Sequence, residues 1–353
     1  MKTGLTEWFE NQGADFVETD GVQLPVRVSG AGKEYAAARE SLALFDGGDR
    51  GWMEMSGPDT ADFLQRMLSS DVRELSAGGG QWSALLNGKG KWVSDFLLFG
   101  LEGRGVDVIG IDLPASRLAP VRQVFEMAHF GEELSWSSPP SNRLLVLGPQ
   151  AETTVAGLGL PLPKKESPSC VSTPELTILR RPDRGESCLE LIGNRESVLE
   201  QAERLVAEGG VPSGLAALDI LRVEALVPRW GTDFGEESTL PETNEWHRAS
   251  FTKGCYTGQE VVAKIHTYGE APRQLCHLSF HSGTTPLHGA EIQDEEGESV
   301  GRVTSWVWSP LQDRPIGLGL LRRKAAHEGN RLWAVSEEIR EPLKLSLPPK
   351  AQI

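Results

Sequence analysis

The sequence predicts an α+β fold that ends in a small β-barrel. Segments with strand and helix periodicity are mixed without strict alternation, which argues against a doubly wound parallel sheet. After Pro272 the chain changes to short β-like runs at 275–280, 299–307, 316–321 and 331–335. Strands at such spacing with few helices are typical of a barrel. We expect a region 1–270, with subdomains at about 1–140 and 141–270, and a barrel domain 271–353.

Two segments of the first region share the order strand, Gly-Pro pair, helix. An alternating run at 52–55 leads to Gly57-Pro58, and apolar residues at helical spacing follow at 63–68. A second strand at 143–147 leads to Gly148-Pro149 and a helix-prone stretch at 151–158. Proline suits the first turn of a helix. The recurrence predicts a degenerate internal repeat.

Turn and cap residues delimit the other elements. Runs at 82–86 and 91–99 flank Asn87-Gly88-Lys89-Gly90, a hairpin signal because Asn-Gly accepts the positive φ angles of tight turns. Apolar residues on one face predict a helix at 118–128, and Gly209-Gly210 closes another at 196–208. Pro228 ends a helix that begins at residue 215. Strands are expected at 176–180 and 188–192.

Bulk composition excludes several classes of protein. A net charge of -15 disfavours strong nucleic-acid binding, which needs clustered Lys and Arg. The four cysteines include no Cys-x-x-Cys pair, so we expect neither a disulfide framework nor a bound metal or iron-sulfur cluster. Residues 1–10 hold no apolar core of signal-peptide length, and no apolar run approaches the roughly 18 residues of a membrane span. We expect a cytoplasmic protein without a membrane partner.

Residues 253–260, which read Lys-Gly-Cys-Tyr-Thr-Gly-Gln-Glu, form a candidate site. The octapeptide places the Cys255 thiol two residues from the cation of Lys253, with a glycine on either side to permit unusual backbone angles. Nearby positive charge and backbone N–H groups stabilise a thiolate. The alternative interpretation is packing, because a cysteine after glycine is often a small apolar residue under a turn.

The octapeptide resembles the signature of the YgfZ/IBA57 branch of the superfamily that also holds the glycine-cleavage aminomethyltransferase, or T-protein. Further stretches resemble other blocks of that superfamily, in the same order along the chain. They lie at 39–46, 56–59, 86–95, 221–225, 240–244 and 301–305. The resemblance implies an aminomethyltransferase-like folate-binding fold with mixed and antiparallel sheets.

Asp95 is a second candidate because it lies within an expected apolar strand. Aspartate is depleted in strands, and burying its charge without partners is costly. Such a carboxylate needs either a structural arginine partner or a ligand. The resemblance implies that Asp95 faces a folate nitrogen and that Glu224 helps to hold the pterin ring.

The resemblance also implies the remaining site residues and the cofactor, tetrahydrofolate or a derivative. Trp230-Gly231 stands where the superfamily often has Tyr-Gly, which keeps an aromatic face for a pterin. The expected catalytic residues are Cys255, Lys253 and Asp95. The expected folate-binding residues are Asp95, Glu224, Arg222, Trp230, Tyr256, Gln259 and Glu260.

Three functions are compatible with these observations. The leading hypothesis, implied by the resemblance, is a tetrahydrofolate-binding accessory protein that supports iron-sulfur cluster enzymes and tRNA modification. Its partners are then folate and iron-sulfur enzymes or assembly factors, and Cys255 is either a nucleophile or a transient cluster ligand. The alternative is a folate-dependent aminomethyl or methyl transferase of the T-protein type, with Asp95 as acid or base. A plain binding module is the third.

Overall fold

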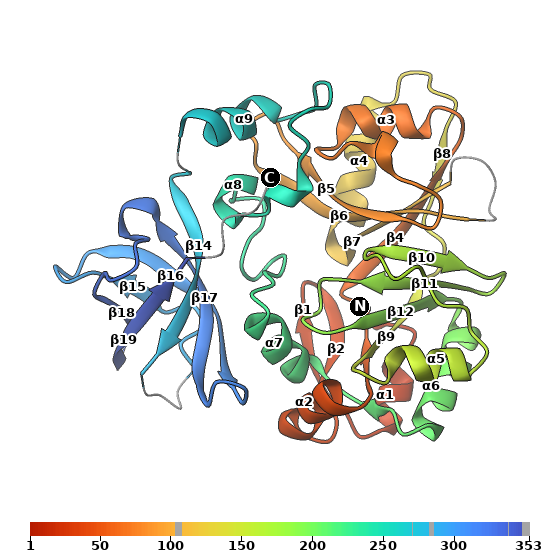
Figure 1. Ribbon diagram of the computed structural model, residues 1–353, viewed down its shortest axis with the longest axis horizontal. Helices are drawn as coiled ribbons and strands as arrows, with labels where there is room; N and C mark the ends of the chain where they lie inside the picture. The colour runs from red at the N-terminus through yellow and green to blue at the C-terminus, as the bar shows by residue number, and fades with distance from the viewer. Residues whose placement is uncertain (103–107, 270, 282–285, 338, 348–353) are drawn as a thin grey trace. The chain divides into compact units, whose positions relative to one another are not determined.

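The computed structural model describes residues 1–102, 108–269, 271–281, 286–337 and 339–347 (Figure 1). Its backbone contacts divide the chain into two units, and neither is one continuous stretch. The first unit comprises Met1–Leu85, Val93–Leu218 and Arg248–Tyr256, and the second comprises Leu86–Trp92, Asp219–His247 and Thr257–Ile353. The domain boundaries expected from the sequence stay a prediction.

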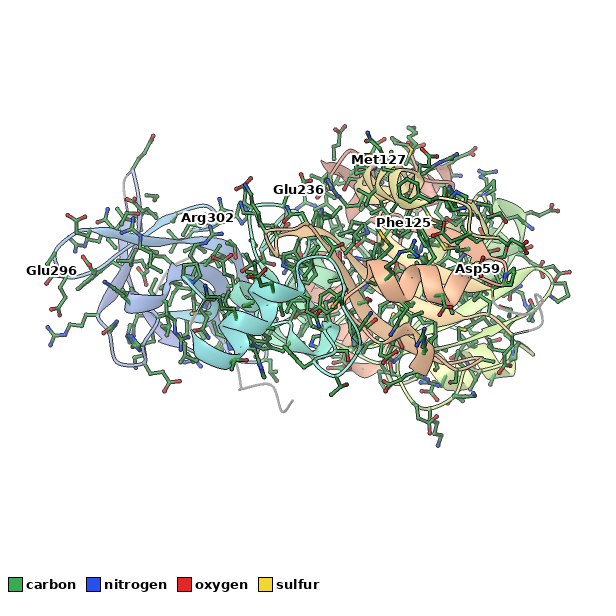
Figure 2. The ribbon with its side chains drawn as sticks, turned by 90° about the horizontal axis from the view of Figure 1, so that it is seen from above. Asp59, Phe125, Met127, Glu236, Glu296 and Arg302 are labelled. Carbon is green, nitrogen blue, oxygen red and sulfur yellow. The ribbon has the colours of Figure 1, made fainter. Side chains whose placement is uncertain are left out.

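The first unit contains a five-stranded sheet covered on one face by two helices. In sheet order its strands are β5 (Gly80–Leu86), β6 (Trp92–Gly100), β7 (Ile109–Pro114), β4 (Arg50–Ser56) and β8 (Ser135–Ser137). Helices α3 (Thr60–Met67) and α4 (Leu118–Ala128) pack Phe63 and Phe125 into its core. On α4, Phe125 is fully buried whereas Met127 is 71% exposed (Figure 2). The apolar stripe predicted for residues 118–128 therefore faces the sheet.

A six-stranded sheet forms the other half of the first unit. In sheet order its strands are β10 (Ser169–Ser172), β11 (Leu176–Arg181), β12 (Cys188–Gly193), β9 (Asn142–Leu147), β3 (Ala43–Asp46) and β13 (Val211–Pro212). Helices α1 (Thr6–Asn11), α5 (Ala151–Gly157) and α6 (Arg195–Ala207) contribute to one apolar cluster with it. The unit also holds β1 (Asp15–Thr19), β2 (Val22–Arg27) and α2 (Ala31–Glu40).

The two sheets of the first unit share a core that is apolar in one part and charged in another. Leu97 and Phe99 of β6 belong to one apolar cluster with Leu179 of β11 and Ile192 of β12. Side chains alternate along a strand, so Asp95 lies on the face of β6 that carries Leu97 and Phe99. The next layer of this core is formed by buried ionic side chains, described below.

Both predicted strand-Gly-Pro-helix units are present, as β4 followed by α3 and β9 followed by α5. The glycines are needed for a geometric reason. Gly57 and Gly148 have φ angles of 132° and 119°. A Cβ on Gly57 would lie 2.3 Å from the carbonyl oxygen of Glu133, and one on Gly148 would lie 2.6 Å from that of Ser41. Only glycine fits either corner.

The second unit contains the closed barrel that the sequence predicts. Its strands, in order around the barrel, are β14 (Arg273–Phe280), β17 (Arg314–Arg322), β16 (Ser299–Ser309), β15 (Glu291–Gln293), β18 (Leu332–Ser336) and β19 (Ile339–Ser346). Strands β15 and β19 were not expected, because one is only three residues long and the other contains Pro342. The α+β prediction with a small C-terminal barrel is confirmed.

Helix α7 (Leu215–Glu224) begins in the first unit and continues in the second from Asp219 onward. The second unit also contains α8 (Leu240–Thr243) and α9 (Gln259–Tyr268). Helix α9 was missed by the sequence analysis, since its β-branched residues weaken the helical signal. Short 3-10 helices lie at Val72–Glu74, Ala115–Arg117, Trp246–Arg248 and Arg323–Ala325. Among the described residues, none of the helices has the length and apolarity that a membrane crossing requires.

Candidate functional site

Asp95 lies in the middle of β6, and the two oxygens of its carboxylate have different environments. Oδ2 accepts a hydrogen bond from an Arg50 terminal nitrogen at 2.9 Å. Oδ1 is buried, and no group in the described part of the chain donates to it. The residue is only 4% exposed. The arginine partner that the sequence allowed is therefore present at one oxygen, the other oxygen is an unsatisfied acceptor, and the ligand at Asp95 stays a prediction.

Arg50 on β4 bridges Asp95 and a second buried acid, Asp112 on β7. Its Nε donates to Asp112 Oδ1 at 3.0 Å, and its other terminal nitrogen donates to the Asp112 carbonyl oxygen at 3.2 Å. The charges of the two acids outweigh the opposing effect of burial and raise the pKa of Arg50. Arg50 therefore remains a cation that holds Asp95 from one side.

Arg248 flanks the same carboxylate from another direction. One terminal nitrogen lies 3.8 Å from Asp95 Oδ2, and the other donates to the Phe96 carbonyl oxygen at 3.1 Å. The guanidinium carbon lies 4.2 Å from the centroid of the Trp82 ring, at cation–π distance. The site thus combines two guanidinium groups, an indole face and one free carboxylate oxygen. Such an arrangement can accept a hydrogen bond or a proton from a ligand N–H group.

Lys253, the first residue of the octapeptide, has partners other than those expected. Its ammonium group donates to the carbonyl oxygens of Gln65, Leu68 and Ser70 at 2.7, 2.7 and 2.6 Å. These carbonyls lie at and just beyond the C-terminal end of α3, where a cation is favourable. Burial lowers the pKa of Lys253 to about 8. All three contacts point to a structural role, and a catalytic role for Lys253 stays a prediction.

Cys255 and Tyr256 contrast in burial. Cys255 is an exposed free thiol, whereas Tyr256 is 7% exposed. Burial raises the pKa of Tyr256 to about 12, and no hydrogen-bond partner for its hydroxyl lies in the described part of the chain. The Lys253 ammonium lies 5.4 Å from the centroid of the Tyr256 ring. The chain then passes from the first unit to the second between Tyr256 and Thr257.

The last three residues of the octapeptide begin α9. Gly258 has a φ angle of 83°, and a Cβ there would lie 2.6 Å from the carbonyl oxygen of Asn87 in the hairpin turn. Glycine is therefore required for the close packing of this turn on the start of the helix. Gln259 and Glu260 form the first turn of α9, with Gln259 half-buried and Glu260 exposed.

Arg222 is buried in an ionic cluster of the second unit. It donates to Asp219 at 2.6 Å, to Asp233 at 2.8 Å and to the Ser305 hydroxyl at 2.9 Å. Burial by itself lowers the pKa of Arg222, but the two aspartates raise it above its usual value. This side chain ties α7 to barrel strand β16, and its expected contact with folate stays a prediction.

Glu224 and Trp230 also lie in the second unit. Glu224 ends α7, and its Oε1 accepts hydrogen bonds from the Ser309 hydroxyl and, at 3.4 Å, from the backbone N–H of Leu311. The Trp230 ring meets Phe234 edge-on with centroids 5.6 Å apart. The folate-binding roles of Glu224 and Trp230 stay predictions.

A cavity of about 210 Å³ follows the end of α7 within the second unit. Its walls include Leu226 and Pro228 after the helix and Leu275, His277 and Leu318 from the barrel. Burial lowers the pKa of His277 to about 4, so its imidazole is neutral near pH 7. Across the described residues, no three His, Cys, Asp or Glu side chains converge as a metal ion requires.

Sequence reasoning missed Arg50, Asp112, Trp82 and Arg248. Asp112 carried the same signal as Asp95, since it lies between Ile111 and Leu113 in an apolar strand. An arginine or tryptophan in a strand is too common at surfaces to be singled out from one sequence. They come together around Asp95 because β4, β6 and β7 are neighbours in one sheet and because residues 248–256 again belong to the first unit.

Comparison with known proteins identifies the family to which this chain belongs. The glycine cleavage system aminomethyltransferase T from Bartonella henselae has the same fold, with a TM-score of 0.91, 24% identity and coverage of 99% of this chain and 97% of that one. Residues 5–245 match the GCVT N-terminal domain, and residues 273–349 match the glycine cleavage T-protein C-terminal barrel domain. The chain belongs to this GCVT family.

Two curated relatives span nearly the whole chain. The aminomethyltransferase of Bacillus subtilis (strain 168) is 28% identical, with 97% of this chain and 96% of the relative covered. That of Staphylococcus carnosus (strain TM300) is 27% identical, with 94% and 93% covered.

These relatives correct the function expected from the octapeptide. The leading hypothesis of an accessory protein for iron-sulfur enzymes and tRNA modification was wrong, because full-length relatives carry the name aminomethyltransferase. Nothing in the comparisons supports iron-sulfur partners. The physical reason for the error is visible in the structure, where Lys253 and Gly258 of the octapeptide have structural partners. Part of the eight-residue match therefore reflects packing and hydrogen bonding, and the match did not predict the function.

Proposed function

We propose that this chain is an aminomethyltransferase that transfers a one-carbon unit to tetrahydrofolate or a derivative of it. Membership of the GCVT family and the names of the full-length relatives support the reaction class. The observation that carries the proposal is the unsatisfied Asp95 Oδ1 inside a site flanked by two arginines. A buried acceptor without a partner is costly unless a ligand completes it.

In this proposal Asp95 acts as general acid or base at a folate nitrogen. Arg50 holds Oδ2, so Oδ1 is the atom that accepts the ligand N–H or exchanges its proton. Arg248 lies beside the same carboxylate and against the Trp82 ring. Tetrahydrofolate is a substrate here and supplies the nitrogen that receives the one-carbon unit.

The other expected folate ligands remain part of the proposal. Glu224 can accept hydrogen bonds from the amide edge of a pterin once Ser309 releases one of its oxygens. Trp230 offers an aromatic face for stacking. Arg222, Tyr256, Gln259 and Glu260 are kept as weaker candidates, and only a structure with bound folate tests them directly.

Turnover with tetrahydrofolate and an aminomethyl donor tests the proposal. We expect steady product formation by the wild type and a fall of about 100-fold to 10,000-fold for Asp95→Asn, the usual contribution of a general acid or base. Calorimetry should show that the variant still binds tetrahydrofolate. Asp46→Asn is the matched control, because Asp46 is also a strand aspartate that is 4% exposed. Equal loss in both variants, or no turnover by the wild type, would refute the proposal.

We also propose that the chain belongs to the YgfZ/IBA57 side of the family, on the strength of the octapeptide. Cys255 is then a further candidate catalytic residue, since its thiol is exposed. Cys255→Ser changes one atom at a position with no close packing. A loss of turnover with unchanged folate affinity would support the thiol, and unchanged turnover would remove Cys255 from the mechanism.

A further inference from the structure

We infer that Asp112, together with the arginines that hold it, positions Asp95 for proton transfer although none of them touches the ligand. This inference rests on the proposed function. It assigns a role to a buried ion network that spans the two sheets of the first unit. These are positioning residues, which act through Arg50.

Arg50 has little freedom because two rigid strands hold it at three points. Its Nε and one terminal nitrogen bind the side chain and the main chain of Asp112, at 3.0 and 3.2 Å. That leaves the remaining terminal nitrogen for Asp95 Oδ2, at 2.9 Å. Asp112 pairs with Leu97 in the sheet, two residues beyond Asp95 on β6. The direction of Asp95 Oδ1 is therefore fixed by where Asp112 holds the guanidinium.

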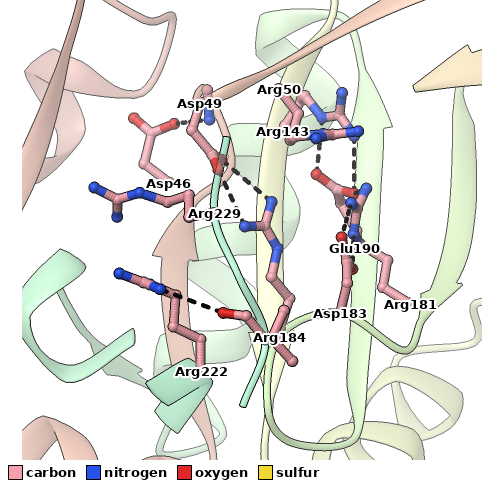
Figure 3. Close-up of polar contacts among 12 residues, drawn as sticks. Asp46, Asp49, Arg50, Arg143, Arg181, Asp183, Arg184, Glu190, Arg222 and Arg229 are labelled. Carbon is pink, nitrogen blue, oxygen red and sulfur yellow. Dashed lines mark hydrogen bonds and ion pairs between the residues drawn. The ribbon is translucent and has the colours of Figure 1, made fainter. Parts of the chain in front are cut away.

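Asp112 is held in turn from the opposite sheet. Arg181 of β11 donates to its Oδ2 at 2.6 Å, and Arg143 of β9 donates to its Oδ1 at 3.3 Å. Glu190 of β12 accepts from both arginines, at 2.8 Å in each of the shortest contacts (Figure 3). The side chains of Asp112, Arg143, Arg181 and Glu190 are completely buried. A chain of charge-assisted hydrogen bonds thus runs from the six-stranded sheet to Asp95.

Asp112 keeps its negative charge in the folded chain. Burial by itself raises the pKa of Asp112, but the three surrounding arginines outweigh burial and hold that pKa well below its usual range. Asp112 is therefore an anion across the physiological range and always binds Arg50. A carboxylate that keeps its charge is suited to holding the Arg50 guanidinium in one place, whereas Oδ1 of Asp95 has no such partner.

Stability alone is a poor explanation for such a network. A buried ion network gains little over well-packed apolar residues, because desolvation offsets most of the attraction. The neighbouring position gives a contrast. Arg180 precedes Arg181 on β11, points to the other face, and pairs with Glu152 rather than with Asp112 or Glu190. The two arginines share a strand and a charge, but Arg181 is the one that contacts Asp112, the group that holds Arg50.

Asp112→Asn tests the inference, because it keeps the shape of the side chain and removes the charge that anchors Arg50. We expect kcat to fall by about 10-fold to 100-fold, since misplacing a reacting group by about 1 Å can cost about 100-fold. The Kd for tetrahydrofolate, measured by calorimetry, should change by less than about 2-fold because no ligand contact is lost. A crystal structure of the variant should show Asp95 turned away from its wild-type rotamer.

Arg180→Gln is the matched control and should leave kcat and the Asp95 rotamer unchanged. If Asp112→Asn does not fold, Arg50→Lys is used instead, since a lysine keeps the charge but cannot bridge both acids. Unchanged kcat and an unmoved Asp95 in the variant would overturn the inference. If the wild type transfers no aminomethyl group, the proposed function fails separately, and the Asp95 rotamer in the crystal structures still decides the positioning role.

Discussion

Asp46 is a buried carboxyl whose protonation links stability to pH. It ends β3, accepts hydrogen bonds from the Thr3 hydroxyl at 2.5 Å and from the Gly48 N–H at 2.9 Å, and is 4% exposed. Burial outweighs these hydrogen bonds and raises the pKa of Asp46 from 3.8 to about 7. Between those two values the folded chain keeps a proton that the unfolded chain has lost.

We therefore expect the stabilising contribution of Asp46 to the free energy of unfolding to be complete below about pH 4. It should be lost as the pH rises through 7. The slope is at most about 1.4 kcal/mol per pH unit. Urea unfolding of the wild type and of Asp46→Asn at several pH values measures this dependence. The difference in the free energy of unfolding between the two proteins should narrow or reverse as the pH rises. If the free energy of unfolding of the two proteins changed with pH in parallel, the pH dependence would not come from Asp46. Acids with lowered pKa values, such as Asp183, titrate below this window.

Gly258 illustrates a residue whose backbone angle and packing exclude any side chain. Gly258→Ala should lower the free energy of unfolding by about 1–3 kcal/mol, the usual cost of one strained residue. Gly254→Ala is the control from the same octapeptide, because a Cβ on Gly254 meets nothing within 4 Å. Its effect should stay within about 0.5 kcal/mol. Similar losses for both variants in denaturant unfolding would show that the φ angle of Gly258 is not the cause.

At the scale of elements, Lys253 connects the octapeptide to the end of α3. Three carbonyl oxygens depend on its ammonium group, and the position is 8% exposed. Ser250 adds a backbone hydrogen bond to the Ser69 carbonyl at 2.8 Å. The segment that carries Cys255 is thereby anchored at two points on the first unit, which gives the exposed thiol a defined place.

Lys253→Met should destabilise the chain by several kcal/mol, since each buried acceptor left unsatisfied costs about 1–3 kcal/mol. Lys264→Met on the exposed side of α9 is the control and should change the free energy of unfolding by less than about 0.5 kcal/mol. Denaturant unfolding measures both variants. If Lys253→Met unfolds like the control, the three carbonyls find other partners and the anchoring role is wrong.

The strand-Gly-Pro-helix units were predictable because their causes are local. Gly57 and Gly148 mark corners that need positive φ angles, and the apolar spacing of the following helices is visible in the sequence. Strand β15 and helix α9 were missed for the opposite reason, since a three-residue strand and a β-branched helix form only where neighbouring elements complete them.

At the scale of the whole molecule, full-length similarity outweighed a short motif. The octapeptide favoured one branch and its accessory function, whereas the relatives aligned over more than nine-tenths of the chain carry the name aminomethyltransferase. Asp95 belongs to both interpretations, so the prediction of its importance did not depend on choosing between them. What changed was the reaction assigned to it.

Local chemistry was sufficient to predict the α+β class, the C-terminal barrel and the anomaly of an aspartate in an apolar strand. Tertiary structure alone decided what surrounds that aspartate. Arg50, Asp112 and Arg248 are 45, 17 and 153 positions from Asp95 in the sequence, and strand pairing brings them together. The low polarity inside the first unit strengthens the interactions between these charges. A buried carboxylate there needs charged or hydrogen-bonding partners, and no local sequence pattern specifies which residues they are.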